Sequence, residues 1–129
     1  MNNNNFDYTV QSKRDFDSTA EGIINEIEKY GMRVLHIHDV RATLAQKGLA
    51  SDSFKMIEFC KADYADTLLR IDPRIGVFLP CKISVYVREH TTHVSVLNFD
   101  HVVGLFSDKS TKDIFVDINT ILRKIVSKQ

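Results

Sequence analysis

Cys60 and Cys81 are the residues of this chain whose type and position best suit chemistry at a site. They are its only two cysteines: Cys60 ends an apolar run, and Cys81 follows Leu79-Pro80 at the start of an alternating segment. A cysteine just before a helix and beside Lys61 favours the thiolate, the form that attacks electrophiles and binds metals. We therefore expect the two thiols to approach each other and line one pocket. The alternative interpretation is two separate, buried core thiols.

The spacing of the two cysteines does not match a zinc or redox motif, and the chain has no C-x-x-C. The sequence also places no general base next to either thiol, so we assign no catalytic residue and no metal ligand set. The favoured hypothesis is a non-enzymatic binding module whose pocket near Cys60 and Cys81 holds a small ligand or metal ion of unknown identity. The alternative is a thiol-dependent redox or sulfur-handling protein, with Cys60 reactive and Cys81 as its resolving partner.

A second candidate ligand-binding position lies at Arg41 and Thr43, in the first turns of a short predicted helix. The free backbone N–H groups of a helix start can accept an anion. His36 and His38 stand two residues apart in a predicted strand, so they share one face and could reach one ion. The more ordinary interpretation of the two histidines is the solvated face of a half-buried strand.

Hydrophobic periodicity divides the chain into strands and helices. The expected strands are 6–10, 32–38, 54–60, 75–79, 82–88 and 93–99, and the expected helices are 15–30, 40–47, 62–71 and 111–126. Ser12 is the expected N-cap of the first helix, and strands 82–88 and 93–99 form a hairpin. This order predicts an α+β domain, in which an antiparallel-rich sheet carries helices packed on one face. An uncovered apolar sheet face is normally buried by a partner or a ligand, so we expect a homodimer.

Composition limits the function classes further. The 129 residues are expected to form a single domain, residues 1–129, with residues 1–5 as a disordered tail. Lys plus Arg and Asp plus Glu each number 17, which disfavours nucleic-acid binding and permits self-association. The sequence has no apolar stretch long enough to span a membrane and no recognisable secretory signal, so we expect a cytoplasmic protein with reduced thiols.

Several short motifs together resemble the domain of unknown function 302 family. They are Phe6-x-Tyr8, Arg41-Ala42-Thr43-Leu44, Cys60, Asp72-Pro73-x-Ile75-Gly76 and Leu79-Pro80-Cys81. The resemblance covers residues 6 to 106, and its most specific part is the order cysteine, helix, Asp-Pro, Leu-Pro-Cys. It implies a TATA-binding-protein-like arrangement of sheet and helices and a homodimer, and it implies no established reaction.

The chain departs from the family pattern at two places. Cys60-Lys61-Ala62 stands where members more often have Cys-Asn-Pro, and Asp100-His101 stands where they often have Asp-Pro. The first difference removes a proline from the helix start and puts a cation beside Cys60. A role that needs the Asn-Pro turn is therefore not expected here.

Overall fold

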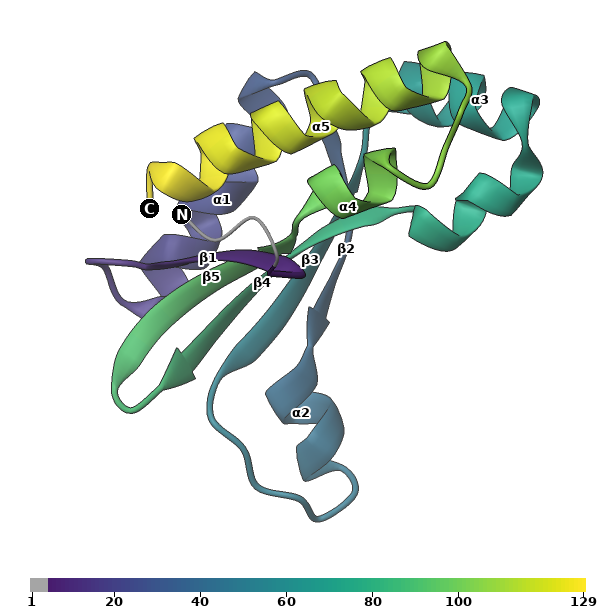
Figure 1. Ribbon diagram of the computed structural model, residues 1–129. Helices are drawn as coiled ribbons and strands as arrows, with labels where there is room; N and C mark the ends of the chain where they lie inside the picture. The colour runs from purple at the N-terminus through teal and green to yellow at the C-terminus, as the bar shows by residue number, and fades with distance from the viewer. Residues whose placement is uncertain (1–4) are drawn as a thin grey trace.

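The computed structural model describes residues 5–129 and contains one five-stranded sheet (Figure 1). The strands are β1 (Asp7–Gln11), β2 (Arg33–Asp39), β3 (Phe54–Cys60), β4 (Cys81–Arg88) and β5 (Thr91–Leu97). The helices are α1 (Phe16–Lys29), α2 (Val40–Ala45), α3 (Ala62–Ile71), the 3₁₀ helix η1 (Pro73–Phe78), α4 (Phe99–Val103) and α5 (Lys109–Ser127).

All neighbouring strands of the sheet are antiparallel, in the order β1-β5-β4-β3-β2. Figure 1 shows the long helices α1 and α5 on the same side of this sheet, while α2 projects away at its far end. The core lies between these helices and the sheet, where residues such as Ile23, Val85 and Phe115 are fully buried. The predicted α+β class, with helices over one face of an antiparallel sheet, is confirmed.

The first long helix begins at a side-chain cap that lies three residues after the cap expected from the sequence. The carboxylate of Asp15 accepts a hydrogen bond from the Ser18 backbone N–H at 2.8 Å, which makes Asp15 the N-cap. Ser12, the predicted cap, instead lies buried with its hydroxyl 2.7 Å from that of Thr19. The helix is followed by Gly31, whose φ of 73° is the left-handed conformation that glycine adopts most easily.

The strand expected over 75–79 is wrong, because these residues belong mainly to η1. The side chain of Asp72 accepts a hydrogen bond from the backbone N–H of Arg74 at 2.9 Å, and Pro73 fixes the first turn. A side-chain cap and a proline together favour a tight helical turn over an extended strand. The apolar residues of this run then serve as one face of a helix, with Ile75 buried in the core.

The remaining predicted elements are present: β3 and α3 have the predicted ends, and the others begin or end at shifted residues. The hairpin between β4 and β5 is confirmed, and its turn is the two residues Glu89 and His90, whose φ values of 52° and 64° fit a tight hairpin. Residues Phe99–Val103 form α4, capped by Asn98, where the prediction ended its last strand at residue 99 and assigned no element to residues 100–110.

The tail expected over residues 1–5 lies outside the described residues except for Asn5, whose carbonyl oxygen accepts a hydrogen bond from Asn98. None of the helices within residues 5–129 combines the length and the apolar character that a membrane crossing requires.

Candidate functional site

Cys60 and Cys81 lie on neighbouring strands at the same end of the sheet. Cys81 is the cross-strand partner of Phe59, and Cys60 is the next residue along β3. Neighbouring strands lie about 4.8 Å apart and rise about 3.4 Å per residue, so the two Cα atoms are about 6 Å from each other. Both residues line one small cavity, which also touches α3 and α5. Both cysteines are free thiols.

Both thiols are held in the neutral form. Burial, and then the charge of Asp63, raises the pKa of Cys60 above its ordinary value. Burial, and then the proximity of Cys60, raises the pKa of Cys81 to about 12. The expectation that Lys61 favours a thiolate at Cys60 is therefore wrong. The ammonium group of Lys61 pairs with Asp63 at 3.0 Å and lies over the ring of Tyr64, and Asp63 adds a negative charge near the thiol.

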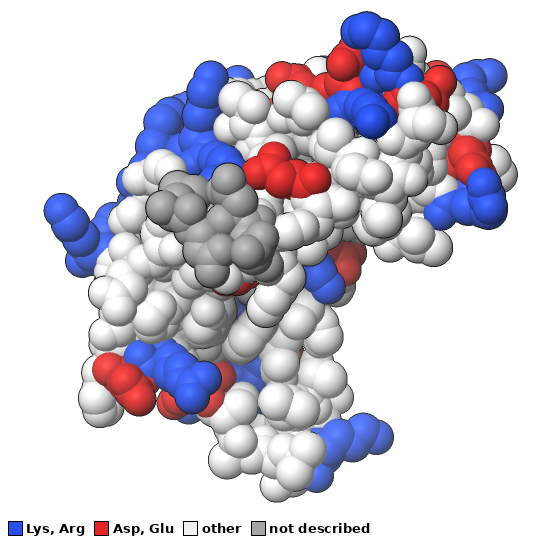
Figure 2. Space-filling view, viewed as in Figure 1, with Lys and Arg blue, Asp and Glu red and all other residues white. Residues whose placement is uncertain are grey.

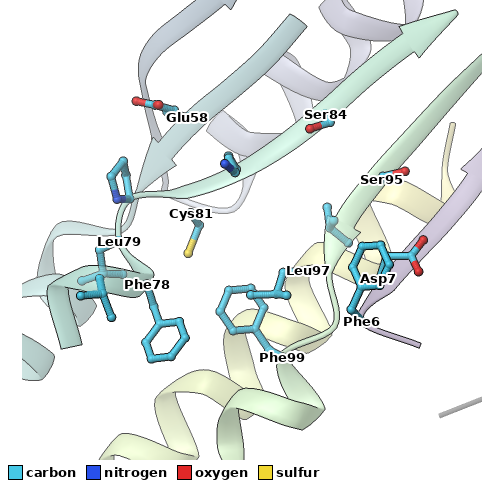
Figure 3. A pocket seen from close by; sticks show the side chains of 14 residues that line it. Phe6, Asp7, Glu58, Phe78, Leu79, Cys81, Ser84, Ser95, Leu97 and Phe99 are labelled. Atoms are coloured by element: carbon cyan, nitrogen blue, oxygen red, sulfur yellow. The ribbon is translucent and has the colours of Figure 1, made fainter. Parts of the chain in front are cut away.

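A notch opens in the sheet beside Cys81, because β4 and β5 separate before β4 reaches its N-terminal end. Their ladder runs from Arg88↔Thr91 to Ser84↔Ser95 and stops there. Beyond that point β4 still pairs with β3, as far as Phe59↔Cys81, and β5 still pairs with β1, as far as Asp7↔Leu97. At this end the sheet is thus divided into β2, β3 and β4 on one side and β5 and β1 on the other, and Figure 3 shows Cys81 and Leu97 on the two sides of the gap.

The notch holds a cavity of about 480 Å³. This volume lies within the range of sites that bind small organic molecules. The aromatic rings of Phe78 and Phe99 form its inner end, where Figure 3 shows the sulfur of Cys81 pointing toward them. Leu97 and Phe6 form its outer apolar wall, and their side chains are 40% and 77% exposed. Such exposed apolar side chains around a concavity are typical of binding surfaces.

The aromatic rings at the inner end of the notch pack in one cluster. Phe115, at the centre, stacks on Phe99 with ring centroids 5.6 Å apart and on Phe106 at the same distance. Phe78 meets Phe106 and Phe115 edge to face, at 6.1 and 6.0 Å. Aromatic pairs in these geometries add to the stability gained from burial. A ligand in the notch would therefore meet a preformed apolar surface.

Polar side chains stand at the mouth of the notch, on the sheet face that α1 and α5 leave uncovered. Glu58 and Lys82 are cross-strand partners there, and Asp7 lines the notch from β1. The hydroxyl of Ser95 is fixed between those of Thr9 and Tyr86, at 2.7 and 2.8 Å. Lys82 and the ordered hydroxyl of Ser95 can therefore contact the polar end of a ligand at the mouth, while Figure 3 shows the carboxylates of Glu58 and Asp7 pointing outward.

Arg41 and Thr43 are not part of this site. Both are exposed residues of α2, which follows β2 at the end of the β2–β3 ladder opposite Cys60. The guanidinium of Arg41 donates to the Ser53 hydroxyl at 3.3 Å, and the Thr43 hydroxyl lies 3.0 Å from His38 Nε2. The structure therefore separates the two pairs of predicted ligand-binding residues.

His36 and His38 do share one face of β2, with ring centroids 6.3 Å apart. Within residues 5–129 no cluster of three or more His, Cys, Asp or Glu side chains is arranged to hold a metal ion. The two histidines therefore lack further ligands of these types.

Charged side chains elsewhere on the surface pair locally. Figure 2 shows red and blue groups side by side along its upper right margin, where α3 and the start of α5 lie. Ion pairs there join Arg70 to Asp66 at 2.9 Å and Lys109 to Asp113 at 2.8 Å. Such exposed pairs contribute little to stability and leave little net charge at this end of the molecule.

The notch residues Phe78, Leu97 and Phe99 were not identified from the sequence. Their apolar character suited core positions, and the alternation of β4 and β5 continues past the point where the strands separate. The one available signal was Pro80 before Cys81, since a proline at a strand end often marks a break in the ladder.

The fold and site define a small single-sheet α+β protein with a ligand-sized notch lined by a cysteine. The sequence model of the family described as "Domain of unknown function DUF302" matches residues 8–128, and the chain belongs to that family. A solved structure, titled as that of the uncharacterized conserved protein DUF302 from Bacillus stearothermophilus, is similar to it with a TM-score of 0.87 and 30% identity, covering 95% of this chain and 97% of that one. A comparison with curated proteins gave no match.

Proposed function

We propose that this protein is a non-enzymatic, homodimeric binding module whose ligand occupies the notch beside Cys81. The observation that carries the proposal is the early end of the β4–β5 ladder at Ser84↔Ser95, which leaves a cavity of about 480 Å³ in an otherwise continuous sheet. The proposed ligand is a small organic molecule with a mainly apolar body. The body packs on Phe78, Leu97 and Phe99, and a polar end reaches Lys82 at the mouth.

The protonation state of the cysteines supports binding more than thiol chemistry. A nucleophilic cysteine acts as a thiolate, usually with a lowered pKa. Here burial raises the pKa of both Cys60 and Cys81. The alternative proposal, a redox or sulfur-handling protein that uses the two thiols, therefore has less support, although their adjacent positions would suit it.

The binding proposal is tested with 1-anilinonaphthalene-8-sulfonate, a dye that fluoresces in apolar cavities and carries one anionic group. We expect one dye per chain in the notch and several-fold weaker binding for Leu97→Gln. The matched control is Leu49→Gln, because Leu49 is also an exposed leucine, at 55% against 40%, and lies outside the notch. Equal dye affinity for wild type and Leu97→Gln would contradict the proposal.

Self-association is proposed separately from the ligand. The formal net charge is +0, so repulsion between copies is weak. The edge strand β2 exposes Leu35 and Ile37, which are 54% and 39% exposed, and exposed apolar edges favour association. At micromolar concentration, light scattering should give about twice the chain mass of 14.8 kDa, and a monomer mass would contradict the dimer.

Two further proposals concern location and a second contact. We propose a cytoplasmic location, where thiols as close as Cys60 and Cys81 remain reduced.

Arg41 and Thr43 remain proposed contacts for an anion, apart from the notch. Inorganic phosphate should then shift their backbone amide NMR signals, and the Arg41→Ala variant should abolish the shift.

A further inference from the structure

The early end of the β4–β5 ladder leaves main-chain hydrogen-bonding groups without a partner strand. The last rung joins Ser84 to Ser95, and continued pairing would next join Lys82 to Leu97 through main-chain hydrogen bonds. The two strands have separated there, so the ladder does not include this pair. The notch is therefore bounded by two strand edges, one from β4 and one from β5.

The hydrogen bonds on the outer sides of β4 and β5 show which main-chain groups face the notch. The Val87 N–H donates to the carbonyl of Ser53 at 3.0 Å, so the odd-numbered residues of β4 pair with β3. The main-chain groups of Lys82 therefore point the other way, into the notch. Just after β5, the Asn98 N–H donates to a carbonyl of the segment before β1 at 2.8 Å. By the same alternation, the N–H and C=O of Leu97 face the notch from β5.

Free strand edges of this kind bind extended peptides, because main-chain hydrogen bonds supply affinity and pockets for alternate side chains supply specificity. A peptide residue opposite Lys82 would lie on the uncovered face of the sheet, beside Leu97. The next residue of the peptide would point to the helix side of the sheet. The rings of Phe78 and Phe99 form the inner end of the notch there, and Figure 3 shows the sulfur of Cys81 pointing toward them. The inner end therefore suits one apolar side chain.

The ammonium group of Lys82 suits a free carboxylate at the end of such a peptide. Glu58 is the cross-strand partner of Lys82, but no ion pair joins Lys82 to a carboxylate within residues 5–129. Hydrogen bonds between ammonium and carboxylate groups are stronger than those between neutral groups. A peptide that ends at the mouth of the notch would gain this contact.

We infer that the notch binds a short, extended peptide with an apolar side chain and a free C-terminal carboxylate. Its main-chain N–H and C=O groups pair with Lys82 of β4 and Leu97 of β5. Its apolar side chain packs on Phe78 and Phe99, and its carboxylate contacts the Lys82 ammonium group. The inference rests on the proposed binding function and specifies the chemical class of the ligand.

The first test is calorimetric titration with the peptide N-acetyl-alanyl-phenylalanyl-alanine. We expect one peptide per chain, and the peptide should displace the dye 1-anilinonaphthalene-8-sulfonate. The same peptide with a methyl group on the phenylalanine nitrogen lacks one N–H donor and should bind about 10-fold more weakly. The peptide with a C-terminal amide should bind about 3-fold more weakly, because it lacks the charge that contacts Lys82. This amide also represents an internal segment of a protein, which has no free carboxylate.

Two protein variants test the assignment of the carboxylate to Lys82. In Lys82→Met, which keeps most of the side-chain stem, the acid and the amide should bind with equal affinity. Lys47→Met is the matched control, because Lys47 is also exposed and lies outside the notch. This control should keep the difference between acid and amide. Equal affinities of acid and amide for the wild type would overturn the assignment of a free carboxylate to the ligand.

The second test is amide hydrogen exchange followed by NMR. Saturating peptide should slow exchange at the N–H groups of Lys82 and Leu97 by at least about 10-fold, because both then donate to the peptide. The N–H of Leu35, on the edge strand β2, is the control and should exchange at an unchanged rate. Unchanged exchange at both Lys82 and Leu97 would overturn the inference, and so would equal affinity for the N-methylated peptide.

The dye titration separates failure of this inference from failure of the proposed function. If wild type binds the dye, Leu97→Gln loses it and the peptide does not bind, then the notch is a binding site and the peptide inference alone is refuted. If neither dye nor peptide binds the wild type, the notch is refuted as a binding site and the inference fails with it.

Discussion

Cys60 and Cys81 stand on adjacent antiparallel strands, one residue out of register, at the end of the sheet where α3 begins. Phe59 and Cys81 share the helix-covered face, and Cys60 follows at the last position of β3. The chain leaves β3 through α3, turns at Asp72-Pro73 and returns through η1 to β4. One connection therefore places both cysteine residues in the wall of the same cavity, and the notch opens next to Cys81.

The first prediction concerns thiol reactivity. At pH 7.5, iodoacetamide should label both cysteines more slowly in the folded protein than in urea, because burial raises the pKa of each thiol. Cys60 should react before Cys81, since only Cys60 is partly exposed. Peptide mass spectrometry measures the two rates separately. Labelling of Cys60 at neutral pH that is faster than in urea would indicate an activated thiolate instead.

The second prediction concerns stability at alkaline pH. The pKa of Cys81 is about 12 in the folded chain, against an ordinary value of 9.0. The unfolded chain therefore loses this proton first as the pH rises. The stability that Cys81 contributes is complete below pH 9 and is lost progressively from there up to pH 12, with a limiting slope of about 1.4 kcal/mol per pH unit.

Urea unfolding of wild type and Cys81→Ala at pH 7 and pH 10 measures this loss. The difference in free energy of unfolding between the two proteins should be smaller at pH 10. Only the wild type has a buried thiol that stays protonated in the folded chain while it loses its proton in the unfolded chain. Comparison with Cys81→Ala removes the contributions of other groups that titrate in this range. A constant difference would show that the thiol keeps its ordinary pKa in the folded chain.

The third prediction concerns the start of α1. Asp15→Ala removes the side chain that accepts the Ser18 N–H, so it should reduce the free energy of unfolding by about 1 kcal/mol. Asp17→Ala is the control, because Asp17 is an exposed acidic residue of the first turn and is not the cap. Chemical denaturation should show the larger loss for Asp15→Ala. If both substitutions cost the same, the effect comes from charge at the helix start and not from capping.

The fourth prediction concerns the aromatic cluster behind the notch. Phe115→Ala removes a fully buried ring that contacts Phe78, Phe99 and Phe106, and it should cost about 3–5 kcal/mol. The neighbouring Val116 is 51% exposed on the same helix, and Val116→Ala should change stability by less than about 0.5 kcal/mol. Thermal unfolding compares the two. Similar losses would mean that the ring does not support the cluster.

The sequence predicted those parts of the fold that local patterns determine. The bounds of β3 and α3 agree with the periodicity at both ends, because apolar spacing and the following Pro73 define them locally. The run Ile75–Leu79 was assigned wrongly because five mainly apolar residues fit a strand as well as one face of a short helix. The hydrogen bond that the Asp72 carboxylate accepts from the Arg74 N–H favours the short helix over the strand. That contact depends on the orientation of a side chain, which local sequence does not determine.

The candidate site was only partly predictable for a different reason. The adjacency of Cys60 and Cys81 follows from the connection between their strands, so local reasoning could anticipate it. The notch depends instead on where β5 stops pairing with its hairpin partner β4 and continues to pair only with β1, which is distant from it in sequence. Alternation along β5 is the same whichever strand it pairs with, so Leu97 carried no local sign of its position.

The pairing of β1 with β5 also affects how the chain folds as it is synthesised. Of the five strands in the described part of the chain, β1 leaves the ribosome first and its partner β5 leaves last, with Asp7 opposite Leu97. Strands β2 to β4 follow one another along the chain and next to one another in the sheet, so they can assemble earlier. β1 therefore remains an unpaired nascent segment, available to chaperones, until β5 has left the ribosome.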